Sequence, residues 1–168
     1  LGGVATAQAA SEMPPIPEVD GPVAEGDGND YTLKFSIGTT ESGAQYRGLE
    51  YFEKIVEQRS DGNIQVELFP GGQIGTVQEM TELVQSGNIT MTTGASVLLS
   101  STVDQLAVLD QFLLFRDEDQ ARSVLDGPAG QALAKAMEDR GLKSMGYMEL
   151  GFRSFTNSRG PLDSYASF

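Results

Sequence analysis

The chain has 168 residues, a net charge of −13, and neither histidine nor cysteine. These absences exclude a Ser-His-Asp triad, a histidine zinc site and a thiolate nucleophile, and an acidic surface disfavours nucleic acid because phosphate backbones repel it. The length suits one hydrophobic core, and no G-x-S-x-G elbow or metal-ligand spacing occurs, so we expect no enzyme, no cofactor and no metal site.

The first 30 residues differ in composition from the rest. Residues 1–10, LGGVATAQAA, are typical of the end of an apolar signal segment with a small-residue cleavage pattern. We therefore expect an exported, periplasmic protein in which this segment is a signal-peptide remnant or the end of an anchor. Residues 11–30 are acidic and rich in proline and glycine, with no Lys or Arg before Lys34. They are expected to form either an extended linker or an arm that docks onto a partner protein.

An α/β pattern begins at Tyr31. Residues 31–38 and 64–69 alternate apolar and polar side chains with the strand period of two, and residues 44–59 place apolar side chains at helical spacing. Residues 88–95, NITMTTGA, are predicted to form a third strand. Strands and helices that alternate at this interval predict an α/β lobe, with a parallel sheet covered by helices on both faces.

The glycine-rich stretch FPGGQIGTVQEM, residues 69–80, raises the question of a phosphate-binding loop. Its glycines follow the pattern GGxxG, without the GxGxxG spacing or the lysine that nucleotide loops use. Thr76 and Glu79 have the spacing of a capping box instead. The stretch is therefore predicted to be a turn from strand to helix, with the helix ending at Ser86-Gly87.

The second half of the chain continues with shorter elements. The apolar run from Leu106 to Phe115 is predicted to be a buried segment or the wall of a binding cleft. Asp117 is expected to cap a short helix, and Pro128 suits the first turn of the next one. Residues 142–150, LKSMGYMEL, are predicted to form a fourth strand.

Ligands of parallel sheets bind beyond the carboxyl ends of the strands. Two predicted loops lie there, and their residues are either ligand contacts or ordinary loop positions. They are Gly38, Thr39 and Thr40 after the first strand, and Gly94, Ala95 and Ser96 after the third.

Arg153 is the strongest candidate site residue, because it lies between Phe152 and Ser154, with Phe155 two places on, in a segment that looks largely inward-facing. Its guanidinium could bind a carboxylate ligand through two parallel hydrogen bonds, or it could form a structural ion pair with one of the chain's many acidic residues.

Three ordered segments resemble the DctP-type solute-binding proteins of TRAP transporters. They are DGNIQVELFPGGQIGTVQEMTELVQSGNITMTTG, VLDQFLLFRDEDQARSVLDG and LKSMGYMELGFRSFTNSRGPL, and the resemblance extends over nearly all of residues 31–162. It implies a two-lobed periplasmic receptor that closes on a small organic anion, such as a carboxylate or a sugar acid. Such a receptor delivers its ligand to the sodium-coupled membrane subunits of a TRAP transporter.

The resemblance also assigns roles to residues. It implies that Arg153 contacts the ligand, that the loops at Gly38 to Thr40 and at Ala95 and Ser96 line the cleft, and that Asn157 is a weaker ligand contact. Residues 31–155 correspond to the first lobe, and residues 156–168 to the start of the crossover to a second lobe, which is missing from this sequence.

Two departures from the family pattern stand out. Phe112 occupies a position where family members usually have proline, and the family's principal carboxylate-binding arginine falls beyond Phe168. The missing second lobe leaves an alternative function open. In that alternative, a receptor-like lobe serves as an accessory subunit of a periplasmic or membrane complex, docked through its acidic N-terminal arm.

Overall fold

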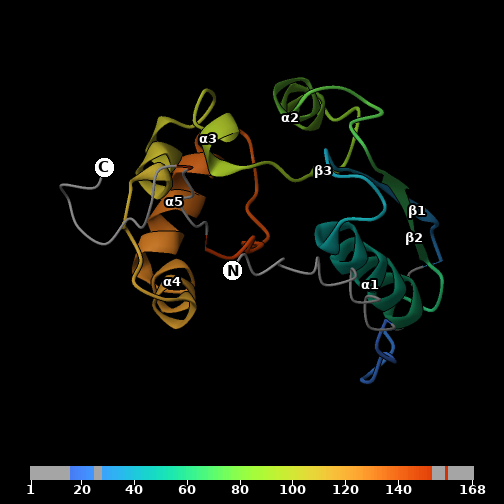
Figure 1. Ribbon diagram of the computed structural model, residues 1–168. Coiled ribbons are helices and arrows are strands. Elements are labelled where there is room, and N and C mark those ends of the chain that lie inside the picture. The colour runs from blue at the N-terminus through green and yellow to red at the C-terminus, as the bar shows by residue number, and fades with distance from the viewer. Residues whose placement is uncertain (1–15, 25–27, 153–157, 159–168) are drawn as a thin grey trace. The chain divides into compact units, whose positions relative to one another are not determined.

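The computed structural model describes residues 16–24, 28–152 and 158 (Figure 1). The chain divides into two compact units, and the division falls between Thr102 and Val103. The first unit holds the sheet and three helices, and the second holds the remaining helices. Among the described helices, none has the length and apolar character needed to cross a membrane.

The sheet of the first unit has three parallel strands in the order β2-β1-β3. They are β1 (Tyr31–Ser36), β2 (Ile64–Phe69) and β3 (Met91–Thr92). In the middle strand, Phe35 lies opposite Leu68 on one side and Met91 on the other. This arrangement confirms the parallel β-α-β-α-β prediction.

The third strand is shorter than predicted, but its pairing continues beyond the two assigned residues. The N–H of Thr90 donates to the carbonyl of Lys34 at 3.1 Å, and the N–H of Thr93 donates to the carbonyl of Ser36 at 3.3 Å. The segment therefore follows β1 from Thr90 to Thr93, half of its predicted length, although its regular ladder is confined to Met91 and Thr92.

Helix α1 (Ala44–Arg59) covers one face of the sheet (Figure 1), with the predicted bounds. Its Leu49 is buried together with Phe35 and Ile37 of the middle strand region and Val66 of β2. The ring of Phe52 meets that of Phe35 edge to face, with centroids 5.7 Å apart. Apolar contacts of this kind stabilise the unit because they remove side chains from water.

Helix α2 (Val77–Gln85) covers the opposite face. Successive side chains of a strand point to opposite faces, so Ser36 faces away from Phe35 and Ile37. Ser36 is fully buried there, and its hydroxyl contacts the sulfur of the equally buried Met80. The prediction of helices on both faces of a parallel sheet is confirmed.

The glycine-rich stretch forms the predicted turn. The side chain of Thr76 accepts a hydrogen bond from the N–H of Glu79, and the Glu79 carboxylate accepts from the N–H of Thr76 at 2.8 Å, which completes the capping box. After the helix, Gly87 adopts a φ of 76°, a left-handed conformation that glycine tolerates without steric cost.

The second unit is built from a 3-10 helix and two α-helices. They are η1 (Asp104–Asp110), α4 (Glu118–Leu125) and α5 (Pro128–Glu138). Asp117 caps α4 and Pro128 opens α5, as predicted. A Cβ at Gly130 would lie 1.6 Å from the carbonyl oxygen of Leu125, so only glycine fits where these two helices approach. The buried apolar side chains of this unit are Val103, Leu106, Ala121, Leu133 and Leu142.

One prediction for this unit is wrong, and one of two alternatives for another segment is excluded. Residues 142–150 form no strand, because a ladder requires a neighbouring strand and none is assigned beside them within the described chain. The apolar run from Leu106 to Phe115 is not a buried segment, so the other alternative, the wall of a binding cleft, stays a prediction. Leu106 is buried, but Phe112 and Leu113 are 82% and 88% exposed, because their place in the turn after η1 leaves them uncovered by described residues.

Candidate functional site

Backbone hydrogen bonds hold the loops after β1 and β2 together at the carboxyl edge of the sheet. The N–H of Gly71 donates to the carbonyl of Thr39 at 2.8 Å, and the N–H of Gly72 donates to the carbonyl of Ile37 at 3.0 Å. Gly38 lies between these two attachments and is exposed. The predicted site residues of the first loop therefore lie on a fixed backbone at the edge where ligands of parallel sheets bind.

Thr39 carries an unusual hydroxyl. Its Oγ1 is buried and has no hydrogen-bond partner among the described residues. The neighbouring Thr40 is satisfied, since its hydroxyl lies 3.1 Å from that of Ser42 and its carbonyl accepts from the N–H of Gly43. A buried polar atom without a partner costs about 1 to 3 kcal/mol, so the Thr39 hydroxyl is a site where a bound polar group would be favoured.

The loop after β3 reaches the same end of β1. Gly94 packs against α2, where a Cβ would come within 2.5 Å of Cγ1 of Val77. Ala95 is exposed and caps the short helix α3 (Ser96–Leu99), with its carbonyl accepting from the N–H groups of Leu98 and Leu99. Since Thr93 is bonded to Ser36, this loop and the one at Gly38 both leave the sheet beside the end of β1.

The structure thus brings two of the three predicted groups of site residues to one edge of the first unit. The third group, Arg153 and Asn157, lies outside the described residues. Their predicted contacts with a ligand remain predictions.

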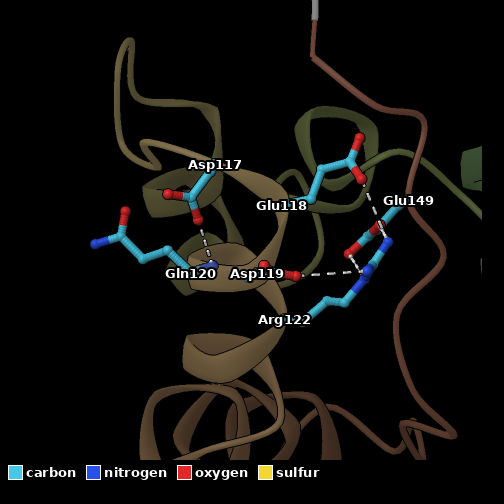
Figure 2. Close-up of polar contacts among 6 residues, drawn as sticks. All are labelled: Asp117, Glu118, Asp119, Gln120, Arg122 and Glu149. Atoms are coloured by element: carbon cyan, nitrogen blue, oxygen red, sulfur yellow. Dashed lines mark hydrogen bonds and ion pairs between the residues drawn. The ribbon is translucent and has the colours of Figure 1, made fainter.

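A second feature, absent from the sequence-based expectations, lies in the second unit. It is a surface depression of about 340 Å³, lined by Arg122, Leu125, Asp126, Tyr147 and Glu149. Figure 2 shows its ion pairs: Arg122 donates from Nε to Oε1 of Glu149 at 2.9 Å and from Nη2 to Oε2 at 2.7 Å. The same guanidinium lies 3.5 Å from Glu118 and 3.9 Å from Asp119.

The electrostatics of this depression do not suit an anionic ligand. Hydrogen bonding to Glu149 and its negative charge raise the pKa of Arg122, so the cation is permanent. Three carboxylates, however, lie within 4 Å of this one guanidinium, those of Glu118, Asp119 and Glu149, and Asp126 also lines the depression. An organic acid would therefore meet net repulsion here and would have to displace Glu149.

Sequence spacing could have found only part of this cluster. Glu118 and Arg122 are four positions apart on one helix, a spacing that predicts an ion pair. Glu149 is 27 positions from Arg122, and no pattern links the two residues. Within the described part of the chain, no group of three or more potential ligand side chains is placed to hold a metal ion.

Comparison with known proteins places this architecture among bacterial receptors. Residues 35–168 match the family model DctP, described as bacterial extracellular solute-binding protein, family 7. The 2,3-diketo-L-gulonate-binding periplasmic protein YiaO of Escherichia coli is 33% identical over 135 residues, which are 80% of this chain and 41% of the relative.

Two solved structures are also similar. A TRAP periplasmic solute-binding protein from Ochrobactrum anthropi, with its C-terminus bound in its ligand-binding pocket, matches with a TM-score of 0.76 and 38% identity over 80% of this chain and 42% of that one. The sugar-acid-binding protein DctPAm of Advenella mimigardefordensis, in complex with galactonate, matches with a TM-score of 0.73 and 30% identity over 79% of this chain and 43% of that one. The chain thus spans about two fifths of the length of these relatives.

Proposed function

The chain belongs to the DctP family, the bacterial extracellular solute-binding proteins of family 7, and on this premise we propose that it is the N-terminal lobe of a TRAP receptor. The receptor acts outside the cytoplasm, in the periplasm. It binds a small organic acid and delivers it to the sodium-coupled membrane subunits of a TRAP transporter. Because the chain spans about two fifths of its relatives, the second wall of the cleft is expected to come from a second lobe.

The proposed ligand class is a carboxylate, in particular a sugar acid. Two similar proteins carry such ligands in their names or structures, 2,3-diketo-L-gulonate and galactonate. Arg153 is proposed to hold the carboxylate through two parallel hydrogen bonds from its planar guanidinium, with Asn157 as an additional polar contact. The hydroxyl groups of a sugar acid would then be left for the neutral polar groups of the lobe.

The observation that carries this proposal is the buried hydroxyl of Thr39, which has no hydrogen-bond partner within the described part of the chain. It lies in the loop after β1, beside the exposed Gly38 and at the sheet edge shared with Ala95 and Ser96. A hydroxyl donates and accepts hydrogen bonds, so it matches the alcohol groups of a sugar acid better than a second cation would. The loops after β1 and β3 would therefore bind the polyol part, and Arg153 the acid group.

The proposal is tested by calorimetric titration of the native polypeptide with galactonate and with galactitol, in which a CH2OH group replaces the carboxylate and the rest of the chain is the same. Galactonate should bind and galactitol should not. Arg153→Lys keeps the charge but loses the paired donors, so affinity should fall by about 1 to 3 kcal/mol. Arg116→Lys, at an 82% exposed side chain paired with Asp117, is the matched control and should leave affinity unchanged.

Equal affinity in the wild type and Arg153→Lys would assign Arg153 to a structural ion pair. Failure of every sugar acid and dicarboxylate to bind or to raise the melting temperature would reject solute capture by this polypeptide.

A further inference from the structure

The outer face of α1 is covered by another part of the chain. Phe52 and Val56 pack towards the sheet, whereas Lys54 and Gln58 point away from it, one helical turn apart. Yet no residue from 51 to 57 in this described helix is exposed. A helix that covers a sheet normally leaves its outer face to water, but from Tyr51 on only Gln58 and Arg59 of α1 are exposed, so another segment partly covers this face.

The covering segment is the acidic N-terminal segment. Lys54 Nζ donates to the carbonyl of Pro17 at 3.2 Å and lies 3.3 Å from the Glu18 carboxylate, and Gln58 Nε2 donates to the carbonyl of Val19 at 3.3 Å. Figure 1 shows this segment, in blue, beside α1.

The contact continues past the end of α1. Arg59 Nη2 donates to the carbonyl of Asp20 at 2.7 Å, and the carbonyl of Arg59 accepts from the N–H of Ala24 at 2.7 Å. The side chain of Val19 is buried, with 9% of its surface exposed.

The spacing of these contacts explains why an irregular segment fits a helix. Alternate carbonyls of an extended chain recur about every 6.6 Å, and four helical residues advance about 6 Å. Lys54 and Gln58, four residues apart, bind the carbonyls of Pro17 and Val19, two residues apart. Side chains of the helix thus donate hydrogen bonds to every second carbonyl of the N-terminal segment, which needs no regular secondary structure of its own.

We infer that the outer face of α1, formed by Lys54, Gln58 and Arg59, is a binding surface for an extended acidic peptide, and that its occupant is residues 17–24 of the same chain. The charges are complementary at one position, where the Glu18 carboxylate lies 3.3 Å from Lys54 Nζ, whereas Arg59 binds the backbone carbonyl of Asp20. The segment is then part of the folded lobe. A partner protein that docked through these residues would first have to displace them from α1.

The attachment also has a consequence for the proposed ligand site, although it does not depend on ligand binding. Arg59 is the last residue of α1, so the segment is fastened where the chain turns back to begin β2. In a parallel sheet this is the amino edge, opposite the carboxyl edge at Gly38 and Ala95. A peptide bound on this surface leaves the candidate site open.

The inference is tested by amide hydrogen exchange on the full chain, with the Ala24 amide as the reporter. In the wild type this amide should exchange at least tenfold more slowly than in a free peptide of residues 16–25, after correction for intrinsic rates. Val19→Ser should remove most of this protection, because it replaces the buried side chain. Val23→Ser, at a valine that is 54% exposed in the same segment, is the matched control and should retain it.

Three results would overturn the inference. In the first, the Ala24 amide of the wild type exchanges as fast as it does in the free peptide. In the second, Val19→Ser and Val23→Ser reduce the protection of this amide equally. The third is protection that disappears on tenfold dilution, which would show that the segment binds α1 of a second copy. Gln58→Ala gives an independent check from the helix side and should mimic Val19→Ser.

Discussion

Arg122 and Glu149 hold each other through two parallel hydrogen bonds, of 2.9 and 2.7 Å, that join α4 to the segment after α5. Because Glu149 occupies the Nε–Nη2 edge of the guanidinium and Asp119 lies 3.9 Å from Nη1, this arginine is not free for an organic acid. Arg122→Lys keeps the charge and removes the fork, so it should destabilise the protein slightly. A double-mutant cycle with Glu149→Gln, measured by urea denaturation, gives the coupling free energy between the two side chains. This coupling free energy should be smaller in about 1 M salt than in about 0.1 M salt, because salt screens exposed ion pairs. A coupling that salt leaves unchanged would contradict this account.

Thr39→Val should have opposite effects on stability and binding. It removes a buried hydroxyl that has no partner among the described residues, so the unliganded protein should become as stable or up to about 2 kcal/mol more stable. If the hydroxyl contacts the ligand, affinity for a sugar acid should fall at the same time. Thr32→Val, at an exposed threonine of β1 outside the candidate site, is the control for both measurements. Loss of stability in Thr39→Val would indicate that the hydroxyl has a partner in the free protein.

The capping box of α2 should make stability depend on pH in acid. Hydrogen bonds from the backbone N–H of Thr76, and then from its side chain, lower the pKa of Glu79 in the folded state. The folded protein therefore binds fewer protons than the unfolded chain, and the stabilisation is present above the unfolded pKa of about 4.3 and is lost as pH falls through the folded pKa.

Glu79→Gln separates the charge from the hydrogen bond, because glutamine also completes a capping box. Urea midpoints should fall more steeply below about pH 4 in the wild type than in Glu79→Gln. Thr76→Ala should cost about 1 kcal/mol at neutral pH. If the urea midpoints of the wild type and of Glu79→Gln fall equally as the pH is lowered, Glu79 does not stabilise the protein through its charge.

Met80 is the central side chain of the α2 face, with none of its surface exposed. Met80→Ala should cost about 2 to 5 kcal/mol, because it leaves a cavity and removes the contact with the Ser36 hydroxyl. Met145→Ala, at a methionine that is 75% exposed, should stay within about 0.5 kcal/mol of the wild type. Chemical denaturation measures both, and similar costs would contradict the packing described here.

The parts of the fold that were predicted depend on interactions between near neighbours in sequence. The bounds of α1 follow from apolar residues three and four positions apart, and the cap of α2 follows from Thr76 and Glu79, three positions apart. The parallel sheet was predicted because strands and helices alternate at short intervals. The loops at Gly38 and Ala95 lie at the same edge of the sheet because each follows the carboxyl end of a parallel strand.

The features that the sequence did not predict depend on distant parts of the chain. Residues 142–150 have a strand-like pattern, but a strand exists only where another strand pairs with it. Phe112 and Leu113 are apolar without being buried, because composition does not say what covers a segment. The N-terminal segment was expected to be either a linker or a partner-binding arm. Its average composition does not reveal that Val19 and a few backbone carbonyl groups attach it to α1.

The order of the strands has a consequence for biosynthesis. β1 is made first but lies in the middle of the sheet, and its partners follow at separations of 33 residues for Ser36 and Phe69 and 56 residues for Lys34 and Thr90. During synthesis both of its edges stay unpaired until these later segments arrive, and unpaired edges promote aggregation. A holdase chaperone, or dilution during refolding, should therefore raise the yield of this protein without changing its final stability.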